Sequence, residues 1–224
     1  MTACSTVPPQ RAEKGPPSSS NLQLSSLAKT DIDMVTEIHQ RETFGHLRAL
    51  MEKLYRRNPR EWRKSGQPTL ERAVSRVFEV QHDWQFPELG GKRGIDSLNL
   101  AFQETYQGDR VLAFVVGLSS MIMSSYNDKA EFFILDDLEP QKLYNSARNV
   151  EVAAWKLGTA RDSRGELFLL SNEAGGSVRN LSFEREFGKI IAHQDTMARI
   201  VAEKTNRSIV HVLQGVATAV FLPI

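Results

Sequence analysis

The longest strongly apolar stretch of the sequence, Val111 to Met123, sets the main constraint on the fold. It is interrupted by Gly117, Ser119 and Ser120, and it is shorter than the roughly 20 residues that a helix needs to cross a bilayer. The stretch therefore predicts a buried core helix. The chain has 224 residues, 41% of them hydrophobic and 25% charged, which is enough to cover such a helix without metal ions or disulfides.

Most of the remaining sequence also carries apolar residues at helical spacing, divided by start and stop signals. Thr30 or Asp31 can cap the first helix and Pro59 stops it, while Asp109 caps the core helix. Asp137 and Pro140 start a later helix, and Ser182 caps a long one. The predicted helices cover approximately residues 31–58, 68–78, 95–107, 111–126, 140–157, 182–205 and 209–222.

Three segments break the helical pattern. Residues 80–94 contain Pro87 and three glycines and are predicted to form a loop, and residues 131–135 fit either a strand or a continuing helix. The stretch near 166–183 has room for one small β-hairpin. We therefore predict a mainly α, single-domain helical bundle of six to seven helices over residues 27–224.

Residues 1–26 are rich in proline, serine and glycine and contain few large apolar groups. Such a segment cannot offset its ordering entropy by burial, so we predict a flexible tether. The only cysteine of the chain, Cys4, lies in this tether, so no disulfide can form within the chain.

Met1-Thr2-Ala3-Cys4 resembles the end of the box that precedes the lipidated cysteine of bacterial lipoproteins. The segments RNLSFEREFGKIIAHQD and LYNSARNVEVAAW are also similar to proteobacterial hypothetical lipoproteins, a likeness that implies no activity. The resemblance implies an acyl anchor on Cys4, and Ser5 after it implies the periplasmic face of the outer membrane. A lipoprotein signal also needs a charged and an apolar segment before the box. We therefore expect a start upstream of Met1, or a signal that has been removed.

The clearest charge feature is residues 41–76, where ten cations and four acids give a net charge near +6. The cations are closest together in residues 55–64, where aromatic residues alternate with them. Such a pattern can bind phosphate or carboxylate groups. We predict partner binding there, by a protein or an anionic envelope component. The predicted contacts are Tyr55, Arg56, Arg57, Arg60, Trp62, Arg63 and Lys64. The other interpretation is a solvated helix end whose arginines complement the helix dipole.

Residues 128–139 form an acidic patch near −4, which could pair with the basic segment within the fold or between molecules. His39, Glu42 and His46 could share a helix face and bind zinc, although no H-E-x-x-H pattern is present. A histidine pair on the surface is the simpler interpretation, and we predict no metal, cofactor or catalytic residue.

The sequence thus predicts a membrane-anchored envelope lipoprotein that acts as a helical, non-catalytic binding or accessory module. Two alternatives remain open. One is a soluble enzyme with a site in the 80–94 loop, built on His82, Asp83 and Glu88, for which a cleft lined by these residues is required. The other is a cytoplasmic helical regulator that binds nucleic acid through the basic segment. The overall net charge of +1 argues against the second alternative.

Overall fold

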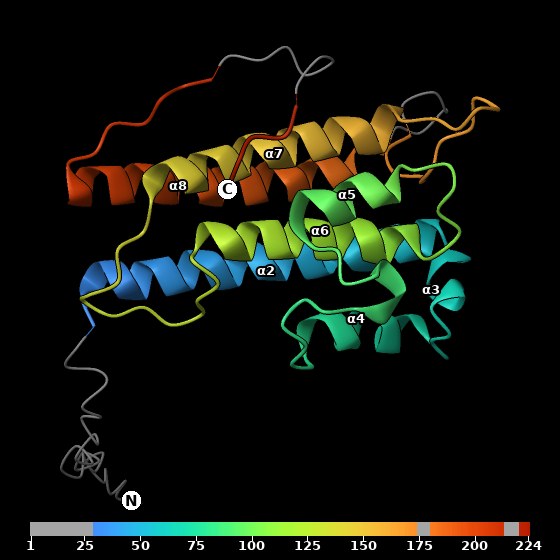
Figure 1. The fold of residues 1–224 in the computed structure, drawn as a ribbon, viewed down its shortest axis with the longest axis horizontal. Coiled ribbons are helices and arrows are strands. Elements are labelled where there is room, and N and C mark those ends of the chain that lie inside the picture. The colour runs from blue at the N-terminus through green and yellow to red at the C-terminus, as the bar shows by residue number, and fades with distance from the viewer. Residues whose placement is uncertain (1–28, 174–179, 213–219) are drawn as a thin grey trace, which may run out of the picture.

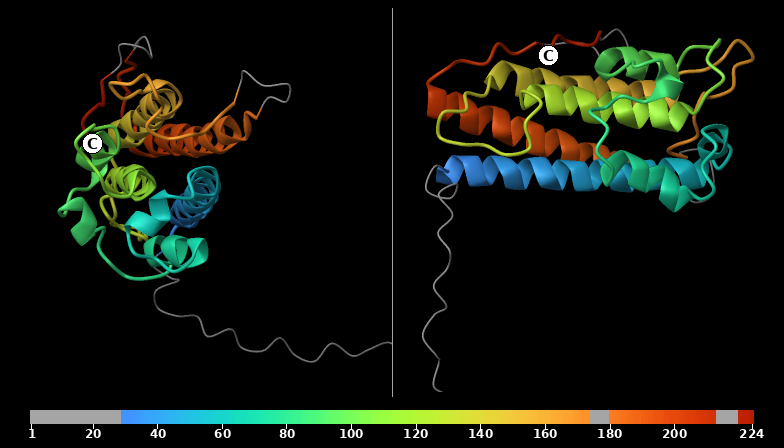
Figure 2. Two further views of the ribbon diagram at one scale, coloured as in Figure 1. Left: turned by 90° about the vertical axis from the view of Figure 1, so that its right-hand side faces the viewer. Right: turned by 60° about the horizontal axis from the view of Figure 1, so that its bottom comes forward.

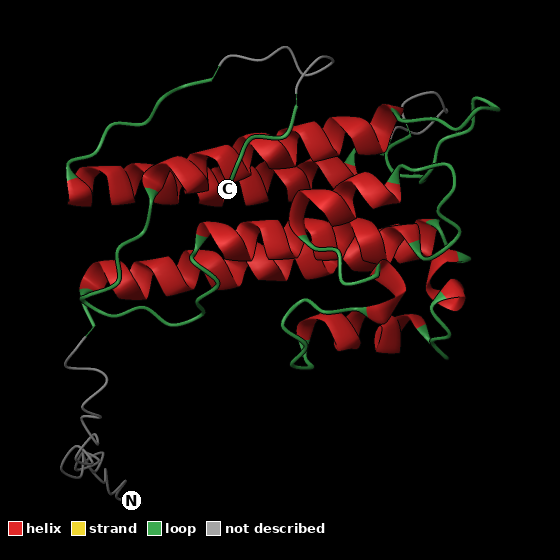
Figure 3. Cartoon of the chain, in the orientation of Figure 1, coloured by secondary structure: helices red, strands yellow, loops and turns green. Residues whose placement is uncertain are grey.

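The computed structural model of the protein describes residues 29–173, 180–212 and 220–224. The predicted mainly α bundle is confirmed: within these ranges the chain forms seven α-helices and one short 3-10 helix, and no regular strand (Figure 3). The elements are α2 (Asp31–Arg57), α3 (Glu61–Lys64), α4 (Leu70–Phe78), η1 (Pro87–Leu89), α5 (Gly94–Ala101), α6 (Arg110–Ser125), α7 (Pro140–Thr159) and α8 (Ser182–Thr205).

The core helix predicted from the apolar stretch is α6, and nearly all its side chains are buried. It packs against α2, α5 and α7, while α8 packs against both α7 and α2 (Figures 1 and 2). Gly117 sets the approach of α5, because a Cβ there would lie 2.7 Å from the backbone nitrogen of Leu98. None of the helices in the described ranges is long and apolar enough to pass through a lipid bilayer.

Several predicted helix starts are confirmed. Thr30 and Asp33 form a reciprocal capping box at the start of α2, and the Asp109 carboxylate accepts from the Leu112 amide at the start of α6. Pro140 occupies the first turn of α7, although Glu139 rather than Asp137 is the N-cap. Ser182 is the first residue of α8 and does not cap it.

Two predicted elements are corrected. Of the hairpin near 166–183, the described part holds only isolated antiparallel bridges, Arg161 with Leu167 and Glu173 with Asn180, and residues 174–179 lie outside the described ranges. Residues 131–135 are neither strand nor helix; they form a turn whose Ile134 and Leu135 side chains are exposed.

The predicted last helix, 209–222, is also wrong where the structure describes it, since residues 209–212 and 220–224 are not helical. Instead, side-chain amides of α7 form hydrogen bonds with the backbone N–H and C=O groups of this segment. Gln141 accepts from the Val210 amide at 2.8 Å, and Asn149 accepts from the Leu222 amide at 2.6 Å and donates back to the Leu222 carbonyl at 2.8 Å. Asn145 donates to the carbonyl of Pro223 at 2.9 Å. This amide ladder satisfies the backbone without a helix.

The N-terminal half of α2 buries polar residues and exposes apolar ones. Its buried side chains in this half are Asp33, Thr36, Gln40 and Thr43. Each has a hydrogen-bond partner; the Gln40 amide, for example, donates to the carbonyl of Lys129 at 2.7 Å. Met34 and Ile38, predicted from their spacing to face the core, are each 47% exposed. Among the residues that the structure describes, Met34 and Ile38 therefore form a small apolar patch on the outer side of α2.

Candidate functional site

A groove of about 1010 Å³ lies along α2. One wall of the groove is α2 itself. The second wall is the end of α4 with residues 80–84, and the third is the end of α6 with the loop that follows it. The apolar part of its lining consists of Phe44, Val77, Phe78, Val80, Trp84 and Met123. A concave site of this size, lined by aromatic and aliphatic side chains with a few charges, is a typical place for a ligand or a partner segment. We call it the α2 groove.

The α2 groove contains charged groups that the fold leaves available. Within the described ranges, Arg41, Asp83 and Glu131 make no hydrogen bond or ion pair, and all three are exposed. Two other cations of the groove are occupied. Arg48 contacts Glu79 at 2.6 Å, and Arg93 lies 3.6 Å from Asp128. An incoming ligand would therefore meet one unpaired cation on α2 and unpaired carboxylates on the facing loops.

The turn at residues 82–84 places Trp84 in the groove wall. Asp83 and Trp84 have φ angles of 48° and 61°, a left-handed conformation that non-glycine residues rarely adopt. The Trp84 ring packs against Phe44 and His82, with ring centroids 6.0 and 4.9 Å apart. Such strain costs on the order of 1–3 kcal/mol per residue and persists only where neighbouring contacts hold it.

His82 and Asp83 line the α2 groove, so the cleft required by the enzyme alternative exists, but His82 is held as a structural residue. Its Nε2 lies 2.8 Å from the Val77 carbonyl, and its Nδ1 lies 2.9 Å from the Trp84 amide. Both ring nitrogens are occupied, which leaves neither free to accept a proton from a substrate. Glu88 is outside the groove and pairs with Arg76 at 2.6 Å.

The predicted partner-binding segment, 55–64, is divided by the fold. Tyr55 is fully buried, and its hydroxyl donates to the Asp109 carboxylate at 2.8 Å, so this side chain is not available to a partner. Trp62 is half-buried against the core, with the Arg63 guanidinium 4.9 Å from its ring centroid. The remaining predicted contacts, all exposed, are Arg56, Arg57, Arg60, Arg63 and Lys64.

Several of the exposed cations are neutralised by nearby acids. Arg57 contacts Glu173, Arg56 lies 3.7 Å from Glu52, and Lys64 contacts Glu61 at 2.6 Å. No ion pair reaches Arg60 or Arg63 within the described ranges. Glu52 and Glu61 are already counted in the net charge near +6, so of these three acids only Glu173 lowers the charge below that of the segment's own sequence.

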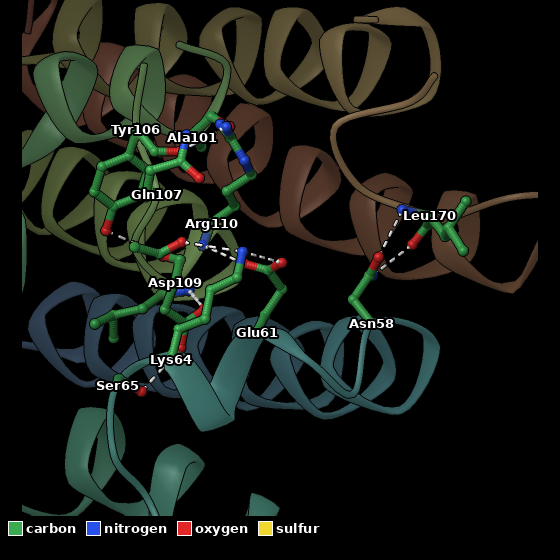
Figure 4. A network of polar contacts seen from close by, with 12 residues as sticks. Asn58, Glu61, Lys64, Ser65, Ala101, Tyr106, Gln107, Asp109, Arg110 and Leu170 are labelled. Atoms are coloured by element: carbon green, nitrogen blue, oxygen red, sulfur yellow. Dashed lines mark hydrogen bonds and ion pairs between the residues drawn. The ribbon is translucent and has the colours of Figure 1, made fainter. Parts of the chain in front are cut away.

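A polar network fixes this segment to α6, as Figure 4 shows. Glu61 accepts from the Arg110 amide at 2.8 Å, and Ser65 donates to Asp109 at 3.1 Å. The Arg110 side chain donates to three backbone carbonyls, those of Ala101, Gln103 and Tyr106. Burial raises the pKa of Asp109 to about 6, against the lowering effect of its hydrogen bonds.

The acidic patch at 128–139 does not pair with the basic segment within the fold. Asp136 contacts Lys129, Asp137 contacts Arg207 at 2.8 Å, and Asp128 faces Arg93. The partners of these acids come from three different parts of the chain, so the patch stabilises local loops and the end of α8.

The histidines proposed as zinc ligands lie between α2 and α8. His39 Nδ1 is 2.9 Å from His193 Nδ1, and His46 Nδ1 is 3.0 Å from Glu186 Oε2. His46 also stacks on His193, with ring centroids 5.9 Å apart. In the parts of the chain that the structure describes, no group of three or more histidine, cysteine or carboxylate side chains is arranged to hold a metal ion. His39 and His46 instead join the two helices.

Cys4 and the predicted tether, residues 1–26, lie outside the described ranges. Comparison with protein-family models, with curated proteins and with solved structures gives no match. The function must therefore be argued from the α2 groove and the surfaces beside it.

Sequence reasoning did not find the α2 groove. Its walls come from three separate segments, and only their packing brings Arg41, Trp84 and Met123 together. One signal was available in the sequence: Gly45 interrupts a long helix, at a cost of about 1 kcal/mol relative to alanine. A Cβ at Gly45 would meet nothing within 4 Å, so packing inside the protein does not require this glycine.

Proposed function

We propose that this protein is a non-catalytic binding module of the bacterial cell envelope that engages a partner protein through the α2 groove. The observation that carries the proposal is the groove itself, in which aromatic and aliphatic walls flank Arg41, a cation without an ion pair in the described ranges. An apolar pocket with a few unpaired charges can give both affinity and orientation to a bound segment.

The membrane part of the proposal rests on the sequence. Acyl chains on Cys4 would fix the protein to the outer membrane, and the predicted tether, residues 1–26, would give the helical domain reach. Burial of acyl chains contributes about 0.8 kcal/mol per CH₂ group, so multiple chains make a stable anchor. Mass spectrometry of the native protein tests this part. We expect the mass of a diacylated or triacylated Cys4, and a free thiol there would refute the anchor.

Site-specific photo-cross-linking in native cells tests the binding role. A benzophenone amino acid at Val80, which is 57% exposed on the groove wall, should give one discrete adduct with a protein identified by peptide mapping. The same amino acid at Glu203, an exposed position on α8 outside the groove, serves as the control and should not give this adduct. Arg41→Glu should then remove the Val80 adduct. If Val80 gives no adduct, or the adduct survives Arg41→Glu unchanged, the groove is not the docking site.

The basic segment remains a proposed second contact surface, now limited to its exposed cations. Arg60 and Arg63 suit a test, because within the described ranges neither makes an ion pair whose loss would disturb the fold. Arg60→Glu with Arg63→Glu should lower the yield of the Val80 adduct if the partner also reaches this end of the molecule. An unchanged yield would remove the basic segment from the binding surface.

A further inference from the structure

The outer face of α2 carries a regular stripe of residues. Met34, Ile38, Arg41, Gly45 and Arg48 follow one another at alternating steps of four and three residues. Residues at this spacing lie in one line along a helix, the line by which helices pack together in coiled coils. Arg41, Gly45 and Arg48 also belong to the α2 groove, so the stripe runs from the exposed apolar pair into the groove. We call it the α2 stripe.

The polarity of α2 is reversed at the start of this stripe. Asp33, Thr36 and Gln40 are buried, whereas Met34 and Ile38 face solvent. Asp33 and Thr36 are satisfied within α2, by the capping box with Thr30 and by the Ile32 carbonyl, and Gln40 donates to the Lys129 carbonyl across the bundle. Met34 and Ile38 form a small apolar patch that continues into the apolar lining of the α2 groove, so the two together give a larger surface to another element.

Gly45 has no side chain, so the helix backbone is exposed at the centre of the stripe. Its position has open space where a Cβ would stand, and it lies between the two arginines of the stripe. Small residues at a helix surface allow a second backbone to approach closely, which strengthens the dispersion contacts between the two helices. The loss of helix propensity at Gly45 is then offset by closer contact with the covering element.

We infer that the α2 stripe and the adjoining groove bind an amphipathic α-helix of a partner protein. This inference rests on the proposed function and names the kind of partner that the groove takes. The stripe from Met34 to Arg48 spans about 21 Å, the length of a helix of roughly 14 residues. The partner helix places its apolar residues on Met34, Ile38 and Gly45, at positions related by i, i+3, i+4 and i+7.

The charges of the site specify the edges of that helix. Arg41 lies within the stripe, and Asp83 and Glu131 lie on the facing loops, all three without ion pairs in the described ranges. A helix with an acidic residue over Arg41 and a basic residue on the flank toward the loops matches both walls. The apolar contacts supply most of the affinity, and these charges fix the orientation of the helix.

Cross-linking from the stripe itself tests the inference. A benzophenone amino acid at Ile38 in the full chain should react with a partner segment whose apolar residues recur at helical spacing. A synthetic peptide of that segment, mixed with the purified protein, should gain helical circular dichroism and should protect Ile38 from reaction. A partner peptide that binds without gaining helix would overturn the inference and leave the proposed function standing.

Two other results have distinct meanings. An adduct between Ile38 and residues of the same chain would show that the protein covers its own stripe, and it would overturn the helix inference. If neither Ile38 nor Val80 gives a protein adduct, while the Glu203 control behaves as expected, the proposed function itself fails.

A glycine pair provides the matched variants. Gly45 and Gly188 both lie within long helices, both are exposed, and neither has an atom within 4 Å of the place of a Cβ. Gly45→Gln and Gly188→Gln should each leave the melting temperature unchanged or raise it by about 2 °C, because glutamine is the better helix former. Only Gly45→Gln should lower the Ile38 adduct yield, by tenfold or more. Equal yields from the two variants would refute close helix packing at Gly45.

Discussion

His39 of α2 and His193 of α8 face each other through their Nδ1 atoms, which lie 2.9 Å apart. One ring must donate and the other accept, so the contact requires at least one neutral imidazole. Burial lowers the pKa of both histidines, and for His193 the charges of His39 and His46 lower it further. The pair thus joins the two helices best when it is uncharged.

This pair makes stability fall in mild acid. Because the folded pKa values lie below the usual value near 6.5, the unfolded chain binds more protons, and the stabilisation present above pH 6.5 is lost as the pH falls through the folded pKa values. The neighbouring charges are Glu42, which favours protonation of His193, and Lys189, which opposes it. The difference in unfolding free energy between the wild type and His193→Gln, measured in urea between pH 8 and 5, should show this loss, because Asp109 is common to both proteins. The same comparison with His211→Gln, at an exposed position, should not show it.

Asp109 is expected to act in the opposite direction. Its folded pKa of about 6 is above the unfolded value, so the folded protein holds this proton more tightly. The resulting contribution to the unfolding free energy is fully present below about pH 4 and is lost as the pH rises through 6. A difference of about two pKa units corresponds to roughly 3 kcal/mol of unfolding free energy. Asp109→Asn keeps an acceptor for the α6 cap and should remove this part of the pH dependence. A carboxyl ¹³C titration with its midpoint near 4 would contradict the prediction.

The wild-type residue Gln194 should lower the unfolding free energy of the bundle relative to an apolar residue at the same position. It is fully buried in α8, and in the described part of the chain neither its amide nitrogen nor its amide oxygen has a hydrogen-bond partner. Gln194→Leu removes the unpaired polar groups and keeps a side chain that fills the site, so we expect a gain of about 1–2 kcal/mol in unfolding free energy. Asn149→Leu is the matched control, because Asn149 is equally buried but makes both amide bonds, and this variant should lose about 2 kcal/mol or more. Calorimetry separates the two outcomes.

The exposed apolar pair of α2 should contribute little to folding. Ile38→Gln removes a half-exposed side chain and should change the unfolding free energy by no more than about 0.5 kcal/mol. Leu47→Ala, on the buried face of the same helix, should cost about 2–5 kcal/mol. Denaturant midpoints of the purified variants give both values. A large loss for Ile38→Gln would mean that Ile38 belongs to the core, which would remove the argument for a covering helix.

The sequence predicted the helices best where capping and periodicity agree. At Thr30 and Asp109 a capping side chain stands directly before an apolar helical pattern, and both helices begin there. The orientation of α2 could not be predicted in the same way. Apolar spacing assumes that apolar residues face inward, but the inner face of this half-helix is satisfied by polar contacts such as that of Gln40 with the Lys129 carbonyl.

The candidate site was harder to predict than the fold. Tyr55 lies beside arginines in the sequence, but its side chain is on the inner side of α2, where its hydroxyl donates to Asp109. The groove depends on the strained turn at Trp84 and on the loop after α6, and neither position follows from local residue preferences. The segment at 209–222 was misjudged for a similar reason, since the side-chain amides of α7 are distant in the sequence from the backbone groups they bind.

The amide ladder of α7 makes the last residues of the chain a working part of the bundle. Deleting residues 221–224 would strand the carboxamide of Asn149, which is fully buried, together with that of Asn145, and would uncover the surface beneath Phe221 and Ile224. A reporter for this protein is therefore better inserted in an exposed loop such as 163–166.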